Sequence, residues 1–356
     1  MKPILPDLLT FSDQSRVSSA SWARRRAELF DAIVLNEYGG MPTESTSVEA
    51  ILACEAGVYP ERSIRYKTYE VRCSLDAGEL SFTLRLWIPP GDGPYPVVLD
   101  GDGCWRYFND QIIHTVVARG YIAASFSRTD LAADNKEKYR DTGLYRLMPD
   151  AGFGALSAWA WGYHRCIDAL TSLDYVRPDQ IAITGHSRGG KAVLLAGATD
   201  QRIAVTNPNC SGIGGSGLNH WKGKGSEMID DFNKSGNIFW FGKGFAEYAG
   251  KDKKTPYDQH YLHGLVAPRG LLLTEAYGDR WANPPGSYSS CRAAEKVYEL
   301  LDGSNNLGWS VREGEHAHSP SDYDALLDFL DMQFLGREVL REFKRELFPD
   351  LDRLLS

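Results

Sequence analysis

A serine stands between two glycines in the stretch GHSRG at 185–189. The β-branched run before it, at 180–184, predicts a short buried strand, and the small and aliphatic residues at 191–198 predict a helix. A turn this tight needs residues without side chains two positions from the serine. The pattern is typical of a nucleophile elbow, which holds a serine hydroxyl above a sheet and near the positive end of a helix. Ser187 is therefore the candidate nucleophile; the alternative is a serine that caps the helix in a glycine-rich turn.

A serine hydroxyl is a weak nucleophile at neutral pH, so it needs a general base, and the base needs an acid to orient it. On a strand–elbow–helix scaffold these residues follow in the order serine, acid, histidine. Asp279 follows one expected strand and His316 follows the last one. Each alone is more often a capping or surface residue, but together, in this order, they favour a Ser187–His316–Asp279 triad. Glu275 is the alternative acid and His318 the alternative base.

Strands and helices alternate along most of the chain, which predicts a mostly parallel sheet with helices on both faces. Expected strands run over 64–73, 80–88, 95–100, 121–127, 180–184, 203–209, 269–276 and 308–312. Expected helices run over 18–35, 110–119, 154–173, 191–198 and 323–335. The fold class is thus an α/β-hydrolase three-layer sandwich, with an antiparallel hairpin at its front edge. We expect one domain over 1–356, with an N-terminal helical and hairpin extension at about 1–78 and a cap-like insertion at about 211–263.

Composition excludes several classes of protein. The net charge is −8 without a basic block, which argues against nucleic acid and anionic membrane surfaces as partners. The six cysteines are scattered without a C-x-x-C pair, so neither a disulfide framework nor a zinc site is expected, and a reducing compartment fits. Near the start of the chain, two prolines and Asp7 lie where a secretory peptide is apolar. These observations predict a cytoplasmic protein, or a secreted one if a signal peptide has been removed. They also predict no metal or other cofactor, and they leave the oligomeric state open.

Short stretches from about Leu29 to Leu335 resemble one known family, in the same order throughout. They are NEYGGMP, GALSAWAWGYHRCIDAL, GHSRGGKA, GATDQRIA, SGIGG, DQH, APRGLLL, GDRWANPPG and REGEHAH. The family is the glucuronoyl esterases, carbohydrate esterase family 15, and two of these stretches resemble its bacterial branch. The resemblance implies a three-layer α/β-hydrolase without a metal. It also implies cleavage of the ester between 4-O-methylglucuronate on xylan and lignin alcohols.

The same resemblance implies roles for residues around the serine. In the family, the arginine that matches Arg188 helps to form the oxyanion hole, beside the backbone N–H expected there from the elbow, and the lysine that matches Lys191 contacts sugar hydroxyls. Trp281 matches a family tryptophan that follows the acid-bearing strand. Glu227 and Trp240 match a glutamate and the first residue of a Trp-Phe pair in bacterial members. These four residues, Lys191, Trp281, Glu227 and Trp240, are the expected substrate-binding set.

The chain departs from the family at three places. Many members place the triad acid where this chain has Cys210, so the acid would have to come from Asp279. A family cysteine before the nucleophile is His186 here, which removes a disulfide. A bacterial arginine pair is replaced by the stretch 218–222, LNHWK. The departures leave open an acetyl esterase on sugars or xylooligosaccharides, and an inactive hydrolase fold that binds carbohydrate; the intact order of acid and base argues against the latter.

Overall fold

The computed structural model describes residues 5–59, 63–349 and 351. The expectations on the first sixteen residues and on a domain spanning 1–356 therefore fall partly outside the described residues. The described part of the chain forms a nine-stranded sheet in the order β1-β2-β3-β5-β4-β6-β7-β8-β9. The strands are β1 (Ser47–Val58), β2 (Ile64–Leu75), β3 (Gly78–Ile88), β4 (Tyr95–Asp100), β5 (Ile122–Ser125), β6 (Val176–His186), β7 (Val205–Asn209), β8 (Gly270–Ala276) and β9 (Leu307–Arg312).

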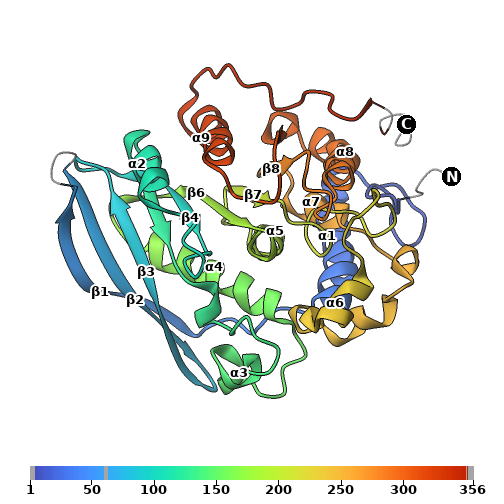
Figure 1. Ribbon diagram of the computed structural model, residues 1–356, viewed down its shortest axis with the longest axis horizontal. Helices are drawn as coiled ribbons and strands as arrows, with labels where there is room; N and C mark the ends of the chain where they lie inside the picture. The colour runs from blue at the N-terminus through green and yellow to red at the C-terminus, as the bar shows by residue number, and fades with distance from the viewer. Residues whose placement is uncertain (1–4, 60–62, 350, 352–356) are drawn as a thin grey trace.

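The sheet changes from antiparallel to parallel along its width. Strands β1, β2, β3 and β5 pair antiparallel, and every later pair, from β5–β4 to β8–β9, is parallel. The predicted hairpin is confirmed as β2 and β3, and Figure 1 shows these strands with β1 at one edge of the molecule. The sequence did not predict β1, because an edge strand that is mostly exposed lacks the apolar alternation that identifies strands.

Helices cover both faces of the sheet, which confirms the predicted α/β-hydrolase sandwich (Figure 1). They are α1 (Trp22–Phe30), α2 (Asp110–Ala118), α3 (Leu144–Leu147), α4 (Ala155–Thr171), α5 (Arg188–Thr199), α6 (Ile229–Ser235), α7 (His260–Val266), α8 (Pro284–Leu300) and α9 (Pro320–Leu335). The sequence did not predict α8. Two prolines open it, and proline is well tolerated in a first helical turn, which Asn283 caps here.

The parallel strands are buried on both faces, so successive side chains enter two different cores. In β6, Ile181 and Ile183 pack into the core that contains α4, α5, α7 and α8, whereas Ala182 packs into the core that contains α2 and α9. This arrangement holds the carboxyl ends of β6, β7, β8 and β9 side by side. The residues expected to do chemistry follow those ends directly.

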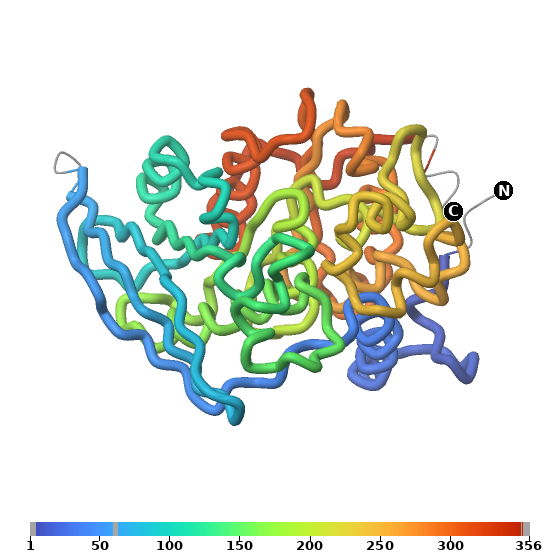
Figure 2. Tube along the Cα trace, turned by 60° about the horizontal axis from the view of Figure 1, so that its bottom comes forward, coloured from blue at the N-terminus to red at the C-terminus, as the bar shows by residue number. Residues whose placement is uncertain are grey.

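The segment 211–263, yellow to orange in Figure 2, lies at the opposite end of the molecule from β1–β3. It contains α6 and short 3-10 helices and begins immediately after β7. Its role as a cap, and the division into a core, an extension and an insertion, stay predictions. None of the helices in the described residues combines the length and the hydropathy needed to cross a bilayer.

Candidate active site

Ser187 occupies the turn between β6 and α5 with φ 55° and ψ −120°. A serine at positive φ is strained and persists only where its surroundings fix it. Its backbone N–H donates to the carbonyl of Asn209 at 2.9 Å, which ties the turn to β7. A side chain at Gly189 would overlap the carboxylate of Asp102, so glycine is required there for close approach as well as for the turn. The hydroxyl therefore stands at the N-terminus of α5, as the elbow pattern predicts.

A buried ion pair between Asp102 and Arg128 stabilises the elbow at the residue before the serine. Asp102 accepts the backbone N–H of His186 at 2.7 Å through one oxygen and Nε of Arg128 at 2.8 Å through the other. The Arg128 guanidinium is fully buried, with its carbon 4.4 Å from the ring centre of Trp105 and 4.3 Å from that of Trp159. Sequence reasoning missed this pair. The available signal was the stretch GDGCW directly after β4, at the edge where the catalytic loops meet.

Asp279 and His316 form a short contact on the loops after β8 and β9. Nδ1 of His316 lies 2.5 Å from Oδ2 of Asp279, and the other carboxylate oxygen accepts the backbone N–H of Ala282 at 3.2 Å. Burial raises the pKa of Asp279, but the hydrogen bond and the charge of His316 outweigh it, and the pKa lies below its ordinary value. The carboxylate is thus ionised and holds the proton of the imidazole on Nδ1.

The alternative acid and base lie in the core. Burial raises the pKa of Glu275 well above its ordinary value, with the charge of Asp279 adding to the effect, so this side chain is neutral. No hydrogen bond in the described part of the chain joins it to His316. His318 is 6% exposed, and its Nδ1 lies 3.0 Å from the Tyr323 hydroxyl. Burial lowers the pKa of His318 well below its ordinary value, which suits a neutral core histidine.

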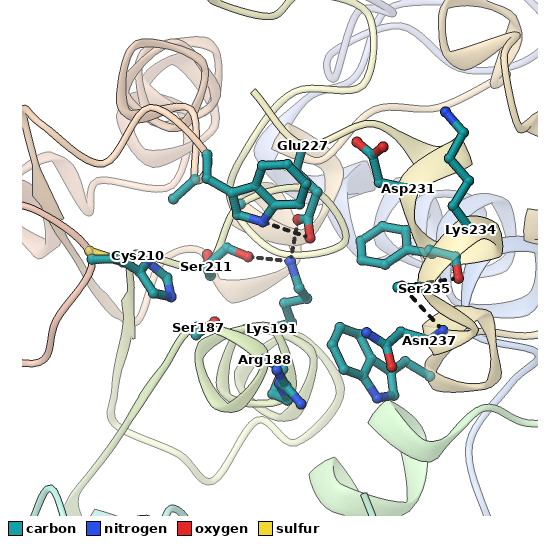
Figure 3. Close-up of a pocket in the computed structure, with 16 residues that line it drawn as sticks. Ser187, Arg188, Lys191, Cys210, Ser211, Glu227, Asp231, Lys234, Ser235 and Asn237 are labelled. Carbon is teal, nitrogen blue, oxygen red and sulfur yellow. Dashed lines mark hydrogen bonds and ion pairs between the residues drawn. The ribbon is translucent and has the colours of Figure 1, made fainter. Parts of the chain in front are cut away.

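A cavity of about 540 Å³ brings the predicted residues together (Figure 3). Its walls include Ser187, His316, Arg188, Lys191, Glu227, Trp240 and Trp281. Asp279 lies behind the histidine ring that it contacts. Every site residue predicted from the sequence is therefore on this wall or directly behind it. The volume is that of a typical small-molecule pocket.

Lys191 lies in the wall of this cavity with its ammonium fully hydrogen bonded. Its Nζ donates to the carbonyl oxygens of Ser211 at 2.6 Å and Ile213 at 2.5 Å, and to Glu227 at 2.9 Å. The other Glu227 oxygen accepts Nε1 of Trp281 at 3.2 Å. An ammonium has three donors, so a direct bond from Lys191 to a ligand must replace or share one of these contacts. The Trp281 ring is half exposed and free to take a ligand on its face.

Arg188 is fixed by a carboxylate that the sequence analysis did not identify. Its Nη1 donates to Asp134 at 3.0 Å, and the second oxygen of Asp134 accepts Nε1 of Trp240, also at 3.0 Å. The guanidinium carbon lies 4.5 Å from the ring centre of Trp240 and 5.3 Å from that of Trp105. Trp240 is buried, so it shapes the wall and orients the arginine. Asp134 comes from the long polar connection between β5 and α4, which has no pattern that marks it.

Cys210 follows β7 directly and is the third group beside the Asp279–His316 pair. Its backbone has φ 44°, and its N–H donates to the carbonyl of Thr274 at 3.0 Å. Burial, with the charges of Glu275 and Asp279, raises the pKa of this thiol well above its ordinary value. A neutral thiol cannot orient a histidine as a carboxylate does. The acid beside His316 is therefore Asp279.

The stretch 218–222 is held by other acidic residues of the same segment. Asp258 accepts the backbone N–H groups of Asn219 at 2.6 Å and His220 at 2.9 Å. The cation of this stretch, Lys222, forms an ion pair with Asp252. The backbone N–H groups of Asn219 and His220 and the ammonium of Lys222 are thus bound by acidic residues of the protein itself.

The mostly parallel sheet, the strained serine and the Asp279–His316 pair define the class of the fold, an α/β-hydrolase. A family profile described as "Glucuronyl esterase, fungi" matches residues 71–302. The chain is 32% identical to a 4-O-methyl-glucuronoyl methylesterase of Podospora anserina over 89% of this chain and 64% of that protein. It is 31% identical to one of Schizophyllum commune, over 95% of this chain and 84% of the relative.

Among solved structures, a carbohydrate esterase family 15 glucuronoyl esterase from Caldicellulosiruptor kristjansonii is 30% identical. It superposes with a TM-score of 0.86 over 98% of this chain and 95% of that one. The chain belongs to the glucuronoyl esterase family. At the level of the family, the predicted resemblance, fold and carbohydrate-ester hydrolysis are confirmed.

The expectation of a cytoplasmic protein is wrong. The fungal relatives are secreted enzymes that act on the plant cell wall outside the cell. The expectation relied on scattered cysteines and on the composition of the first sixteen residues. Neither is a direct signal of location, because free cysteines and a polar start are compatible with more than one compartment. The roles of the individual site residues stay predictions.

Proposed function

We propose that this chain hydrolyses uronate esters of carbohydrates, of the 4-O-methylglucuronate type, through a Ser187–His316–Asp279 triad and an acyl-enzyme. The observation that carries the proposal is one cavity lined by a strained serine and by a histidine whose Nδ1 lies 2.5 Å from an ionised carboxylate. The names of the curated relatives, 4-O-methyl-glucuronoyl methylesterases, supply the substrate class.

In the first half-reaction, Nε2 of His316 takes the Ser187 proton as the hydroxyl attacks the ester carbonyl. Asp279 holds the required tautomer and stabilises the imidazolium that forms. The imidazolium then gives its proton to the leaving alcohol, which breaks the ester bond and leaves the acyl group on the serine. In the second half-reaction, His316 activates water, which releases the uronic acid and restores the serine.

The oxyanion of each tetrahedral intermediate is stabilised at the N-terminus of α5. The backbone N–H of Arg188 follows the nucleophile directly, and the guanidinium fixed by Asp134 adds a positive charge. One such donor contributes about 3 kcal/mol to transition-state stabilisation. The helix N-terminus adds a favourable partial charge of the same sign.

The sugar ring binds against the opposite wall. The exposed face of Trp281 offers a stacking surface, and Glu227 offers carboxylate oxygens to sugar hydroxyls. Lys191 acts chiefly through Glu227, because its three donors are already engaged. Residues 211–263 supply Glu227 and Trp240 to the cavity, which supports our inference that this segment is a cap on a single hydrolase domain.

The test compares the wild type with Ser187→Ala on benzyl glucuronate and on an acetylated xylooligosaccharide. We expect cleavage of the uronate ester by the wild type and its loss in the variant, with unchanged thermal unfolding to show that the fold is intact. Serine-dependent cleavage of the acetyl ester alone would refute the uronate substrate and keep the triad. Equal turnover by both proteins would refute the mechanism.

A further inference from the structure

Cys210 and His316, in the cavity wall, and Asp279 behind the histidine converge at one point. One ligand-type atom from each lies within 4.8 Å of the other two: the thiol sulfur, a carboxylate oxygen and a ring nitrogen. The nitrogen beside the carboxylate is Nδ1, at 2.5 Å. Thiolate, imidazole and carboxylate are the three side-chain ligands that zinc prefers in proteins.

The three residues are held by neighbouring strand ends, so they cannot drift far apart. The Cys210 backbone is pinned to β8 through Thr274, and its sulfur lies 3.9 Å from the carbonyl oxygen of Ala317 on the histidine loop. Ligands of a tetrahedral zinc ion lie about 3–4 Å from one another, given bonds of about 2.0–2.3 Å. The three ligand atoms, all within 4.8 Å of one another, are close to that spacing.

The cluster is accessible from solvent through the cavity. His316 is 38% exposed at its side chain, and Cys210 and Ser187 lie on the same side of the cavity in Figure 3. A hydrated cation that enters the cavity therefore reaches the histidine first. The buried thiol and carboxylate then complete three protein ligands, with water in the fourth position.

We propose that Cys210, Asp279 and His316 form an inhibitory binding site for thiophilic divalent cations such as zinc or cadmium. On binding, a metal–sulfur bond replaces the S–H bond of Cys210, and the proton leaves to solvent. The metal takes Nδ1 of His316, whose proton moves to Nε2, and one oxygen of Asp279. The net change is one metal ion bound and one proton released, and no group is oxidised or reduced.

The consequence for catalysis rests on the proposed function of the triad. With the metal on Nδ1, the Nε2 atom carries a proton and cannot accept one from Ser187. The carboxylate that orients the base is also diverted to the metal. Occupancy of the site therefore abolishes turnover without closing the substrate cavity. Cys210 is needed for this inhibition but not for ester hydrolysis.

The test uses the full chain with its cysteines reduced and the reductant removed. Wild type, Cys210→Ala, Cys210→Ser and Cys54→Ser are each titrated with zinc chloride, and initial rates are scaled to the metal-free rate of the same protein. Cys54 is an exposed cysteine on the edge strand β1 and is the matched control. We expect reversible inhibition of wild type and Cys54→Ser, relieved by a chelator. Half-inhibition of both Cys210 variants should need at least about tenfold more zinc, as loss of a thiolate ligand predicts.

A second readout does not depend on esterase activity. Cadmium added to the wild type should produce the ultraviolet charge-transfer band of a cadmium–thiolate bond with one-to-one stoichiometry, and Cys210→Ala should lose that band. Equal bands in both proteins, or equal zinc sensitivity of all four proteins, would overturn the proposal. If the proposed triad is wrong, the wild type will show no esterase activity even without added metal. The cadmium band would still test the metal site in that case.

Discussion

Asp134 and Arg188 are joined by a 3.0 Å hydrogen bond between Oδ2 and Nη1. The other Asp134 oxygen accepts from Trp240, so one carboxylate fixes both the cation beside the nucleophile and the ring against which that cation lies. The Arg128 guanidinium lies 3.5 Å from the same carboxylate. The position of Arg188 is thus set by a residue that does not itself line the cavity.

Asp134→Ala should lower kcat by about ten- to a hundredfold and change KM little, because an oxyanion donor acts in the transition state and not in the ground state. Asp134→Asn keeps one acceptor oxygen, so its kcat should lie between those of the wild type and Asp134→Ala. Steady-state kinetics on benzyl glucuronate measures the split. A raised KM with unchanged kcat would instead mean that Arg188 contributes to substrate binding and not to transition-state stabilisation.

The identity of the triad acid is tested by a matched pair of amides. Asp279→Asn should lower kcat by at least about a thousandfold, because the amide favours the wrong histidine tautomer. Glu275→Gln, which changes a carboxyl that is already neutral, should keep kcat within about threefold of wild type. Circular dichroism checks that both proteins fold. The reverse ranking of the two rates would transfer the role of acid to Glu275.

Trp281 is half exposed, so its removal tests sugar binding with little effect on the fold. Trp281→Ala should raise KM about two- to tenfold through loss of a stacking face, with kcat nearly unchanged. Trp281→Phe retains an aromatic face but loses the N–H that contacts Glu227. Its KM should therefore lie closer to that of the wild type than the KM of Trp281→Ala does. Thermal unfolding should move little for either variant. An unchanged KM for the alanine variant would exclude stacking at this ring.

Glu37 makes the stability of the fold depend on pH. Burial raises its pKa from 4.5 to about 8, despite the hydrogen bond from Gln259. Between these two values the native state keeps a proton that the unfolded chain releases. The free energy of unfolding therefore falls as pH rises, by up to about 1.4 kcal/mol per pH unit from this group. The contribution is complete below pH 4.5 and is lost by pH 8.

Glu37→Gln removes this titration, so the variant should lose less stability than wild type between about pH 5 and pH 8. Urea unfolding at several pH values measures the difference. Glu37 accepts the backbone N–H of Gly242 through its carbonyl, and the adjacent Tyr38 hydroxyl donates to the carbonyl of Gly214 at 3.0 Å. Loss of stability here would loosen the 211–263 segment first. Parallel pH profiles for the two proteins would contradict the assignment.

Much of the scaffold could be predicted because its signals are local. The strand at 95–100 and the helix at 323–335 have the periodicity of buried elements and match β4 and α9 closely. The elbow was predictable for the same reason, since a strand, a tight turn and a helix N-terminus are all specified within about twenty residues. The order of serine, acid and histidine follows from chain topology alone.

The missing parts depend on partners that are distant along the chain. Asp102 and Asp134 were not identified, because an aspartate in a loop looks the same whether it pairs with an arginine or with solvent. Lys191 was expected to face a sugar, yet its ammonium is met by Ser211, Ile213 and Glu227, which only the folded chain brings near.

The sequence by itself determined the fold class, and it singled out the serine of the elbow and the two loops that carry Asp279 and His316. Tertiary structure decided which carboxyl meets the histidine, because Glu275 lies within β8 in the core, whereas Asp279 lies on the loop after β8 and contacts His316. It also decided what surrounds the pair. Cys210 lies beside it because β7 and β8 are neighbours in the sheet, although 69 residues, the difference between 210 and 279, separate cysteine and aspartate along the chain.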